Sequence, residues 1–129
     1  MFSGMYLQAD VLGSAMQASA LRDTIHAHNI ANADVPNFKK YDVVFEPFLQ
    51  NALEEAKVNG VIDLKKVNFD VLVPEVQKIY KNFEYRIDGN NVDVEAEMAA
   101  LYQNSVRYEI LANGVMGSYQ QINTVLSMN

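Results

Sequence analysis

A repeat of apolar residues near the C-terminus constrains the fold of this chain more than any other feature of its sequence. The repeat advances by alternating steps of four and three residues, the spacing that keeps side chains on one face of a helix. Its positions are Val94, Met98, Leu101, Ser105, Tyr108, Ala112, Val115, Tyr119, Ile122 and Leu126. Asp93 and Glu95 lie where a first turn would form and favour a helix start there. The sequence therefore predicts a helix over about 93–127 with one continuous seam, roughly 50 Å long.

The N-terminal segment carries a weaker form of the same spacing. Its positions are Leu7, Val11, Ser14, Ala18, Leu21, Ile25, His28 and Asn32. The pair Val35-Pro36 ends the pattern, because the residue before a proline avoids helical backbone angles. We expect a helix over about 8–33 and a mainly α fold, in which the two long terminal helices form an antiparallel coiled-coil hairpin.

Charged side chains are scarce at both ends of the chain. Residues 1–21 contain only Asp10 and residues 110–129 contain none, although a fifth of all residues are charged. A helix that faces water normally carries charges on its outer face. The two ends therefore have either an unusual solvated composition or protein neighbours on several sides. Residues 110–129 contain too many amides and hydroxyls to predict a membrane span.

The overall charge and the missing cysteines argue against several classes of function. A net charge of −6 does not suit a surface that neutralises phosphates, so we expect no nucleic-acid partner. Without cysteine the chain has no disulfide, no thiolate metal site and no cysteine nucleophile.

Residues 34–92 have a different character from the two ends. Alternating apolar residues predict short strands or extended segments in three places, Tyr41–Phe45, Val67–Val73 and Phe83–Ile87. Residues 48–57 have the spacing of a short helix, and 88–91 predict a tight turn into the last helix. We therefore divide the chain into a terminal-helix domain, 1–33 with 93–129, and a central region, 34–92.

No group of side chains has the spacing of a catalytic or metal site. His26 and His28 are the only histidines, and side chains two residues apart on a helix diverge by about 200°. The pair Glu54-Glu55 fits a solvated helix face, and Glu95 with Glu97 fits a charged first turn. We predict no catalytic residues, no cofactor and no metal, and we expect the chain not to be an enzyme.

The segment from Asn29 to Phe38 combines asparagines, alanines and a proline at a predicted helix end. It resembles the N-x-A-N-x-x-T-P-G-[YF] signature of the bacterial flagellar axial proteins, a family of rod, hook and hook-associated proteins. The matching residues are Asn29, Ala31, Asn32, Pro36 and Phe38. Val35 stands where the family usually has threonine, and Asn37 where it usually has glycine. The flanking sequences Ala20-Leu21-Arg22 and Val44-Phe45-Glu46 are also similar to those of the family.

A second block, 88–108, narrows this resemblance. Residues 88–98 resemble the D-G-N-x-V-D-x-[DE]-x-E-M block of the proximal rod proteins, and an N-x-x-[RK]-Y pattern follows. The residues that carry the match are Asp88, Gly89, Asn90, Val92, Glu97, Met98, Asn104, Arg107 and Tyr108. Sister rod proteins and the hook protein tend to show a different pattern here, whereas 47–80 is nearly unmatched.

The resemblance implies a structural subunit of the proximal rod, the part of the flagellar drive shaft that transmits torque from the membrane ring towards the hook. It implies location in the periplasmic rod after export by the flagellar type III apparatus. Phe2 to Tyr6 would then be an export signal, or equally the frayed start of the first helix. The implied partners are other copies, the other proximal rod proteins, the rod-to-membrane-ring adaptor and the export gate. The alternatives are a second proximal rod subunit or, from a different class, a small helical export chaperone or binding module.

Overall fold

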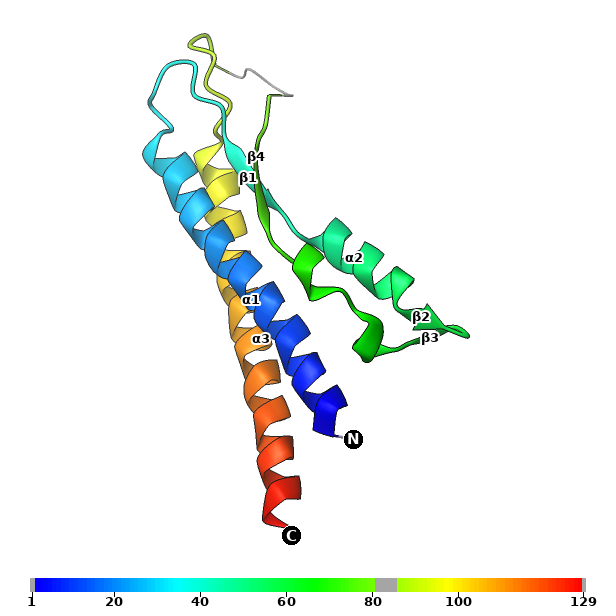
Figure 1. Ribbon diagram of the computed structural model, residues 1–129. Coiled ribbons are helices and arrows are strands. Elements are labelled where there is room, and N and C mark those ends of the chain that lie inside the picture. The colour runs from blue at the N-terminus through cyan, green and yellow to red at the C-terminus, as the bar shows by residue number, and fades with distance from the viewer. Residues whose placement is uncertain (1, 81–85, 129) are drawn as a thin grey trace.

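Two long helices form the spine of the molecule, and a smaller arm projects from it (Figure 1). The computed structural model describes residues 2–80 and 86–128. Helix α1 (Phe2–Ala31) and helix α3 (Val94–Ser127) lie side by side and run in opposite directions (Figure 1). The arm, residues 46–73, leaves the spine about halfway along its length (Figure 1). The mainly helical fold predicted from the sequence is therefore confirmed.

The boundaries of the two long helices follow their local sequence. The start of α3 is capped by Asp93, whose Oδ1 accepts a hydrogen bond of 3.1 Å from the Ala96 N–H. This agrees with the predicted start. Helix α1 begins at Phe2, earlier than predicted, and ends at Ala31, two residues before the predicted end. At its end the Asn32 N–H is shared between the carbonyls of His28 and Asn29, both 3.2 Å away.

Three of the four buried residues of α3 come one position before a residue of the predicted seam, and the fourth, Ile122, belongs to that seam. The buried residues of α3 are Glu97, Asn104, Ser118 and Ile122. The predicted positions Leu101, Ala112 and Val115 are half-buried, whereas Met98, Tyr119 and Leu126 are exposed. The reason is that Glu97 and Asn104 hydrogen-bond to polar groups of α1, which holds this polar stripe inward. Gly114 lies close to Leu12 at a tight approach of the two helices.

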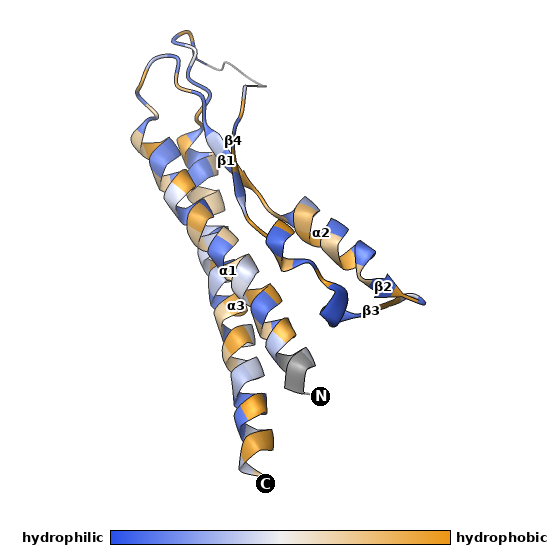
Figure 2. Cartoon of the chain, in the orientation of Figure 1, coloured by the Kyte–Doolittle hydropathy of each residue, from blue (hydrophilic) through white to orange (hydrophobic). Residues whose placement is uncertain are grey.

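Hydropathy explains why the contact face was not obvious. Apolar and polar residues are interspersed around both long helices, and neither shows a purely apolar face (Figure 2). Within the described residues, no helix has the length and apolar character needed to cross a membrane.

A two-stranded ribbon joins the arm to the spine. Strand β1 (Tyr41–Val44) pairs antiparallel with β4 (Glu75–Lys78), with Tyr41 opposite Lys78. The strand predicted at 41–45 is thus present, and Val43 is its buried residue.

The segment predicted as a strand or extended segment at 67–73 forms no strand, although the backbone of Val67 and Asn68 is extended. That stretch follows the 3₁₀ turn η1 (Leu64–Lys66) and contains a second one, η2 (Phe69–Val71). Each turn is capped by the residue before it, because Asp63 Oδ1 accepts from the Lys65 N–H and Asn68 Oδ1 accepts from the Asp70 N–H. For the segment predicted at 83–87, Phe83 and Tyr85 lie outside the described residues, and Ile87 is exposed in a turn.

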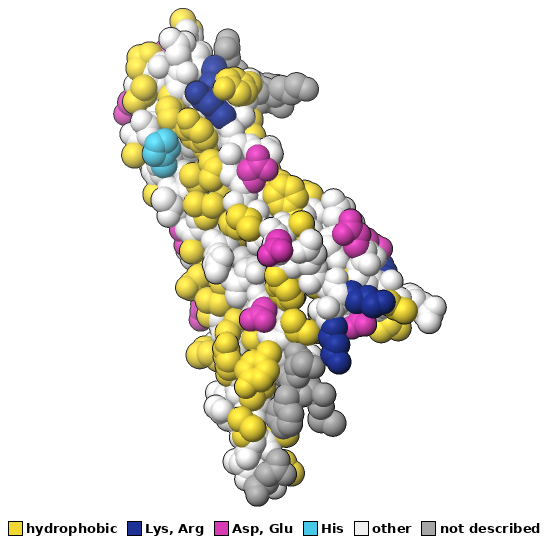
Figure 3. All heavy atoms as spheres, viewed as in Figure 1, with side chains coloured by type: hydrophobic (Ala, Val, Ile, Leu, Met, Phe, Trp, Pro, Cys, Tyr) yellow, Lys and Arg dark blue, Asp and Glu magenta, His cyan; other side chains and the backbone are white. Residues whose placement is uncertain are grey.

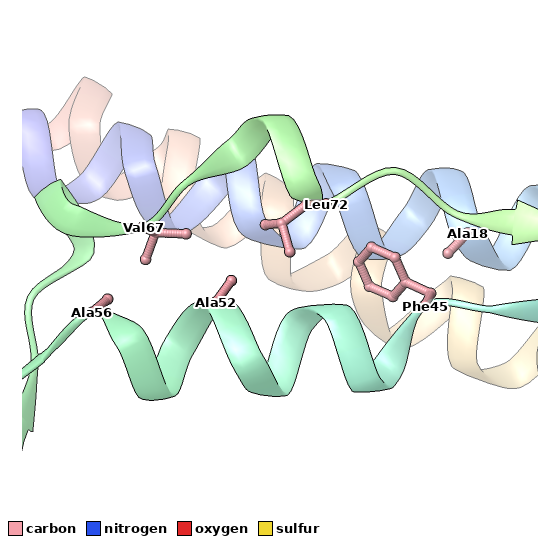
Figure 4. Packing of buried hydrophobic residues seen from close by; sticks show 6 residues of the cluster. All are labelled: Ala18, Phe45, Ala52, Ala56, Val67 and Leu72. Atoms are coloured by element: carbon pink, nitrogen blue, oxygen red, sulfur yellow. The ribbon is translucent and has the colours of Figure 1, made fainter.

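Helix α2 (Glu46–Glu55) and a tight hairpin form the arm. Helix α2 begins two residues before the predicted 48–57 and carries Pro47 in its first turn, where a missing N–H costs nothing. Strands β2 (Lys57–Val58) and β3 (Val61–Ile62) follow, joined by Asn59 and Gly60 at φ 53° and 81°. Six buried residues, Ala18, Phe45, Ala52, Ala56, Val67 and Leu72, join the arm to α1 (Figure 4). Helix α1 is therefore covered by α3 on one side and by the arm on another.

Candidate assembly site

The first sequence block, 29–38, and the start of the second, 88–98, meet at one end of the spine, where α1 ends and α3 begins (Figure 1). Asn90 is 1% exposed and joins them. Its Nδ2 donates to the carbonyl oxygens of Asn32 at 3.0 Å and Val35 at 2.9 Å. Its Oδ1 accepts from the Val92 N–H at 2.8 Å. One side chain thus ties the chain leaving α1 to the chain entering α3.

Asn29 makes the corresponding connection one turn deeper in the spine. Its side chain is fully buried, at 0% exposure. Its amide pairs with the backbone of β1, donating to the Tyr41 carbonyl at 2.8 Å and accepting from the Tyr41 N–H at 2.9 Å. The same Nδ2 also donates to Glu97 Oε2 at 3.1 Å. Asn29 therefore holds α1, β1 and α3 together.

Glu97 is the charged centre of this junction. It lies in the first turn of α3, as predicted, and its side chain is buried, at 4% exposure. His26 Nδ1 lies 2.6 Å from Glu97 Oε2, and Lys40 Nζ lies 3.2 Å from Oε1. Burial by itself would raise the pKa of Glu97, but the hydrogen bonds from His26, Asn29 and Lys40 outweigh it and lower the pKa below its usual value. The buried charge is compensated, as it must be in a stable fold.

The loop that closes this end is tightly packed. Gly89 has φ 74°, and a Cβ on it would come within 2.6 Å of Asn37 Oδ1. Asn37 itself has φ 59° and donates its N–H to the Asp88 carbonyl at 2.8 Å. Asparagine accepts this left-handed backbone more readily than other residues with a side chain. This explains how Asn37 can stand at a position where the flagellar signature has glycine.

A second polar junction lies about two turns further along the spine. Asn104 is 4% exposed, and its Nδ2 donates to the Ser19 carbonyl at 2.6 Å and to Asp23 Oδ1 at 2.7 Å. The Ser19 hydroxyl donates to Asn104 Oδ1 at 2.9 Å. Asn104 is thus bonded on both sides of its amide, which fixes the relative register of α1 and α3.

An ion-pair cluster connects the spine to the arm. Arg22 forms a bidentate pair with Glu46 and also donates to the Val43 carbonyl at 3.1 Å. Arg107 on α3 reaches the same carboxylate at 3.2 Å. The hydrogen bonds from Arg22 are the main cause that lowers the pKa of Glu46. The cluster brings together Arg22 and Glu46, which flank the first sequence block.

The other residues of the two blocks have varied surroundings. Val92 is buried, Phe38 packs its ring near those of His28 and Tyr41, and Asp88 pairs with Arg86 at 3.0 Å. Ala31, Pro36 and Met98 are exposed. Tyr108 is partly exposed beside Gly13 and Ala20 of α1.

Sequence reasoning missed the α1 partners Ser19 and His26 because it searched for apolar periodicity. A usable signal was present, since Ser19 and His26 are seven residues apart and so are Glu97 and Asn104. In an antiparallel pair of helices, this equal spacing lets two polar contacts form in one register.

The site is built to hold elements together. Among the described residues, every buried side-chain nitrogen or oxygen has a hydrogen-bond partner. Within residues 2–80 and 86–128, no cluster of three or more histidine, aspartate or glutamate side chains could hold a metal ion.

Helix α3 also carries a row of large exposed apolar residues, here called the outward stripe. Its large residues are between 49% and 74% exposed and are Met98, Tyr102, Met116, Tyr119 and Leu126. Together with Ser105, Glu109, Ala112 and Asn123 they continue a spacing of four and three, and Glu109 is the only charge among them. On the face shown in Figure 3, apolar side chains cover much of the spine and charged side chains are few. Exposed apolar stripes of this length are typical of protein contact surfaces.

Comparison with known proteins gives a consistent result. Residues 10–39 match the family model described as flagella basal body rod protein. The chain is 30% identical over 118 residues to the flagellar basal body rod protein FlgB of Bacillus subtilis, covering 90% of both chains. It is 31% identical to the FlgB of Borreliella burgdorferi, covering 97% of this chain and 93% of that one. It is 34% identical over 98 residues to the FlgB of Aquifex aeolicus, covering 76% and 75%.

Proposed function

The chain belongs to the FlgB family of flagellar basal body rod proteins, and from this premise we propose that it is a structural subunit of the proximal part of the rod. In this position it forms part of the drive shaft that transmits torque from the membrane ring towards the hook. The rod lies in the periplasm, and the subunit reaches it through the flagellar type III export apparatus.

The observation that carries this proposal is the division of α3 into two stripes. The inner stripe contacts α1 through polar residues that are fully bonded, including Glu97 and Asn104. The large residues of the outward stripe are apolar, and each is at least 49% exposed within the described part of the chain. Burying that stripe against neighbouring subunits would stabilise an assembly by roughly 25 cal/mol for each square ångström of apolar surface.

The polar contacts of the inner stripe suit a subunit that must keep its shape under load. Neutral hydrogen bonds and a compensated charge add little net stability, but they penalise any sliding of α1 along α3 because each displaced group would be buried without a partner. We propose that α1 and α3 form an inner coiled-coil domain, 1–33 with 93–129, and that 34–92 forms a separate central region. Of the predicted seam residues, Ile122 lies in the inner stripe, Ala112 in the outward stripe, and Leu101 and Val115 are half-buried between them, whereas Val94 is exposed.

The proposed partners are other copies of this chain, the other proximal rod proteins, the adaptor between rod and membrane ring, and the export gate. The motif residues around Asn29 and Asn90 act in this proposal by shaping the end of the spine. The family is one of structural proteins, and we propose that this member has no catalytic turnover.

A small helical export chaperone is the competing function from a different class. It would act in the cytoplasm and would not be found in isolated basal bodies. The outward stripe favours permanent assembly, because a chaperone that releases its cargo needs water-compatible helices when it is free.

A charge placed on the outward stripe tests the proposal. Met98→Asp adds a carboxylate near the positive end of α3, where it does not harm the helix, but it places that charge on the stripe. We expect it to abolish swimming and to remove the protein from basal bodies isolated from cells that lack the native subunit. Ala99→Asp is the matched control, because it adds the same charge on the next residue, about 100° around the helix.

Ala99→Asp is expected to leave swimming and incorporation intact. Normal incorporation of Met98→Asp would show that the outward stripe is not an assembly surface. Absence of the unmodified protein from basal bodies would overturn the proposed function itself.

A further inference from the structure

A groove near the free end of the spine contains one charged side chain. It has a volume of about 410 Å³ and lies between α1, η2 and α3. Small residues of α1, among them Ala9 and Gly13, form one side, and the rings of Phe69 and Tyr119 also line it. Asp10 is the only charged residue in the lining. Its carboxylate forms no ion pair within the described residues.

The free end of the arm has the complementary chemistry. Val58, Val61 and Ile62 of the β2–β3 hairpin are exposed, although large β-branched residues are usually covered. Two lysines, Lys65 and Lys66, follow in η1. Basic side chains, in dark blue, are visible at this end of the arm in Figure 3. We call Val58, Val61, Ile62, Lys65 and Lys66 the arm tip.

The two lysines of the arm tip are available for a partner. Lys57 is already paired with Glu54 at 2.6 Å, and Asp63 caps η1 through the Lys65 N–H at 3.1 Å. Within the described residues, Lys65 and Lys66 form no ion pair. The arm tip therefore combines exposed apolar side chains with unpaired positive charge, on a chain whose net charge is −6.

From these two surfaces we propose that the arm tip of one subunit docks into the Asp10 groove of a second copy. Val61 and Ile62 enter between the rings of Phe69 and Tyr119, and a lysine of η1 pairs with Asp10. An ion pair beside apolar contacts is partly screened from water, which makes it stronger than one on an open surface. Lysine also makes favourable contacts with aromatic faces, so the rings that line the groove suit it. This inference rests on the proposed function and names the contact between copies.

The geometry of this contact leads to an open assembly. The arm tip and the groove are different surfaces of one chain, so the contact is heterologous and each subunit offers one surface to each neighbour. Such contacts repeat into rings or helical filaments and do not close into dimers. The contact shares Tyr119 with the outward stripe and uses none of the stripe's other large residues.

Cysteine cross-linking provides a direct test, because the chain has no cysteine of its own. Asp10→Cys and Val61→Cys would be carried on two copies of the chain expressed together in cells that lack the native subunit. Basal bodies would be isolated and treated with a mild oxidant or a short bismaleimide. We expect a cross-linked band at twice the subunit mass of 14.5 kDa when both variants are present. Neither variant expressed alone should give this dimer band. The control pair Asp10→Cys with Glu75→Cys should not give the band either.

Charge reversal gives a second readout that does not depend on cross-linking. Asp10→Lys should reduce incorporation into basal bodies at least tenfold, and Lys65→Glu with Lys66→Glu in the same chain should restore most of it. Glu75→Lys, an equal charge change on β4 outside both surfaces, should have no effect. Circular dichroism of each purified variant establishes that its helix content is unchanged.

The outcomes separate this inference from the proposed function. Variants that incorporate into basal bodies without a cross-linked dimer above the Glu75→Cys control would overturn the arm-to-groove contact and leave the rod function standing. If Asp10→Lys incorporates normally, the ion pair is refuted. If the unmodified chain is missing from basal bodies, both proposals fall together.

Discussion

Replacement of Asn29 by alanine should be among the most damaging single changes in the molecule. The side chain is fully buried and makes three hydrogen bonds, two with the Tyr41 backbone and one with the Glu97 carboxylate. A neutral hydrogen bond contributes about 1 kcal/mol and one to a charged group about 1.5–3 kcal/mol. Asn29→Ala should therefore lower the free energy of unfolding by about 3–5 kcal/mol. That is a large part of the roughly 5–15 kcal/mol typical of a small domain.

Asn32→Ala is the matched control, because both asparagines belong to the same sequence block and the same helix end. Among the described residues, the Asn32 side chain donates only to the His28 carbonyl, at 2.8 Å in an exposed setting. Its backbone carbonyl, which accepts from Asn90, is retained in the variant. We expect a loss of less than about 1 kcal/mol for this change.

The free energy of unfolding is measured by urea unfolding of the purified chain and the Tm by thermal unfolding, both monitored by circular dichroism of the helices. For a chain of this size, 1 kcal/mol corresponds to about 3–5 °C in Tm, so Asn29→Ala should lower Tm by roughly 10–20 °C. If the variant is already unfolded in buffer, sucrose or trimethylamine oxide brings it into the measurable range, and the control is measured under the same conditions. A difference between the two variants of less than about 1 kcal/mol would refute the role assigned to Asn29.

Two further predictions concern unfolding in acid and the backbone at two glycines. Glu97 and Glu46 have pKa values below the ordinary 4.5, so the stability that they contribute is present above that pH and is lost as pH falls through their folded pKa values. The urea midpoint of the unmodified chain should therefore fall in acid. The Glu97→Gln variant should be less stable at neutral pH, but its urea midpoint should fall less steeply with pH. If the two midpoints have the same pH dependence, Glu97 is not the source of the acid sensitivity. Gly89→Ala should destabilise the chain by about 1–2 kcal/mol or more, because φ is 74° and its Cβ would lie 2.6 Å from Asn37 Oδ1. Gly117→Ala should instead stabilise it by up to about 1 kcal/mol, because that position is helical and open. If both substitutions shift the Tm in the same direction, local backbone geometry does not determine stability at these two positions.

The site itself was only partly predictable from the sequence. The resemblance to flagellar axial proteins selected Asn29, Asn90 and Glu97 as important, but it did not say what they contact. The structure brings the three into one junction and adds His26 and Lys40. Lys40 had no distinguishing local signal, and the spacing of His26 from Ser19 has meaning only beside the equal spacing on α3. A partner for a buried carboxylate is identified only when the chain folds back, here over 57 to 71 residues.

Local sequence by itself determined the elements whose stability is local. Asp93 caps α3, the long repeat keeps α3 helical to Ser127, and Asn59-Gly60 adopts the positive φ angles of a two-residue hairpin turn. These outcomes depend on groups within four residues of each other along the chain, so they can be predicted from the sequence alone.

Tertiary structure decided which face of each helix is buried. By hydrophobicity alone, Met98, Tyr119 and Leu126 should lie inward and Glu97 and Asn104 outward, yet the structure has the reverse. A buried polar group is tolerated when its partners are in place, and those partners, Ser19 and Asn29, come from the other end of the chain. The energy of such a group depends on a contact that the local sequence does not contain, and for this reason only the folded chain could show that the inner stripe is polar and the outward stripe apolar.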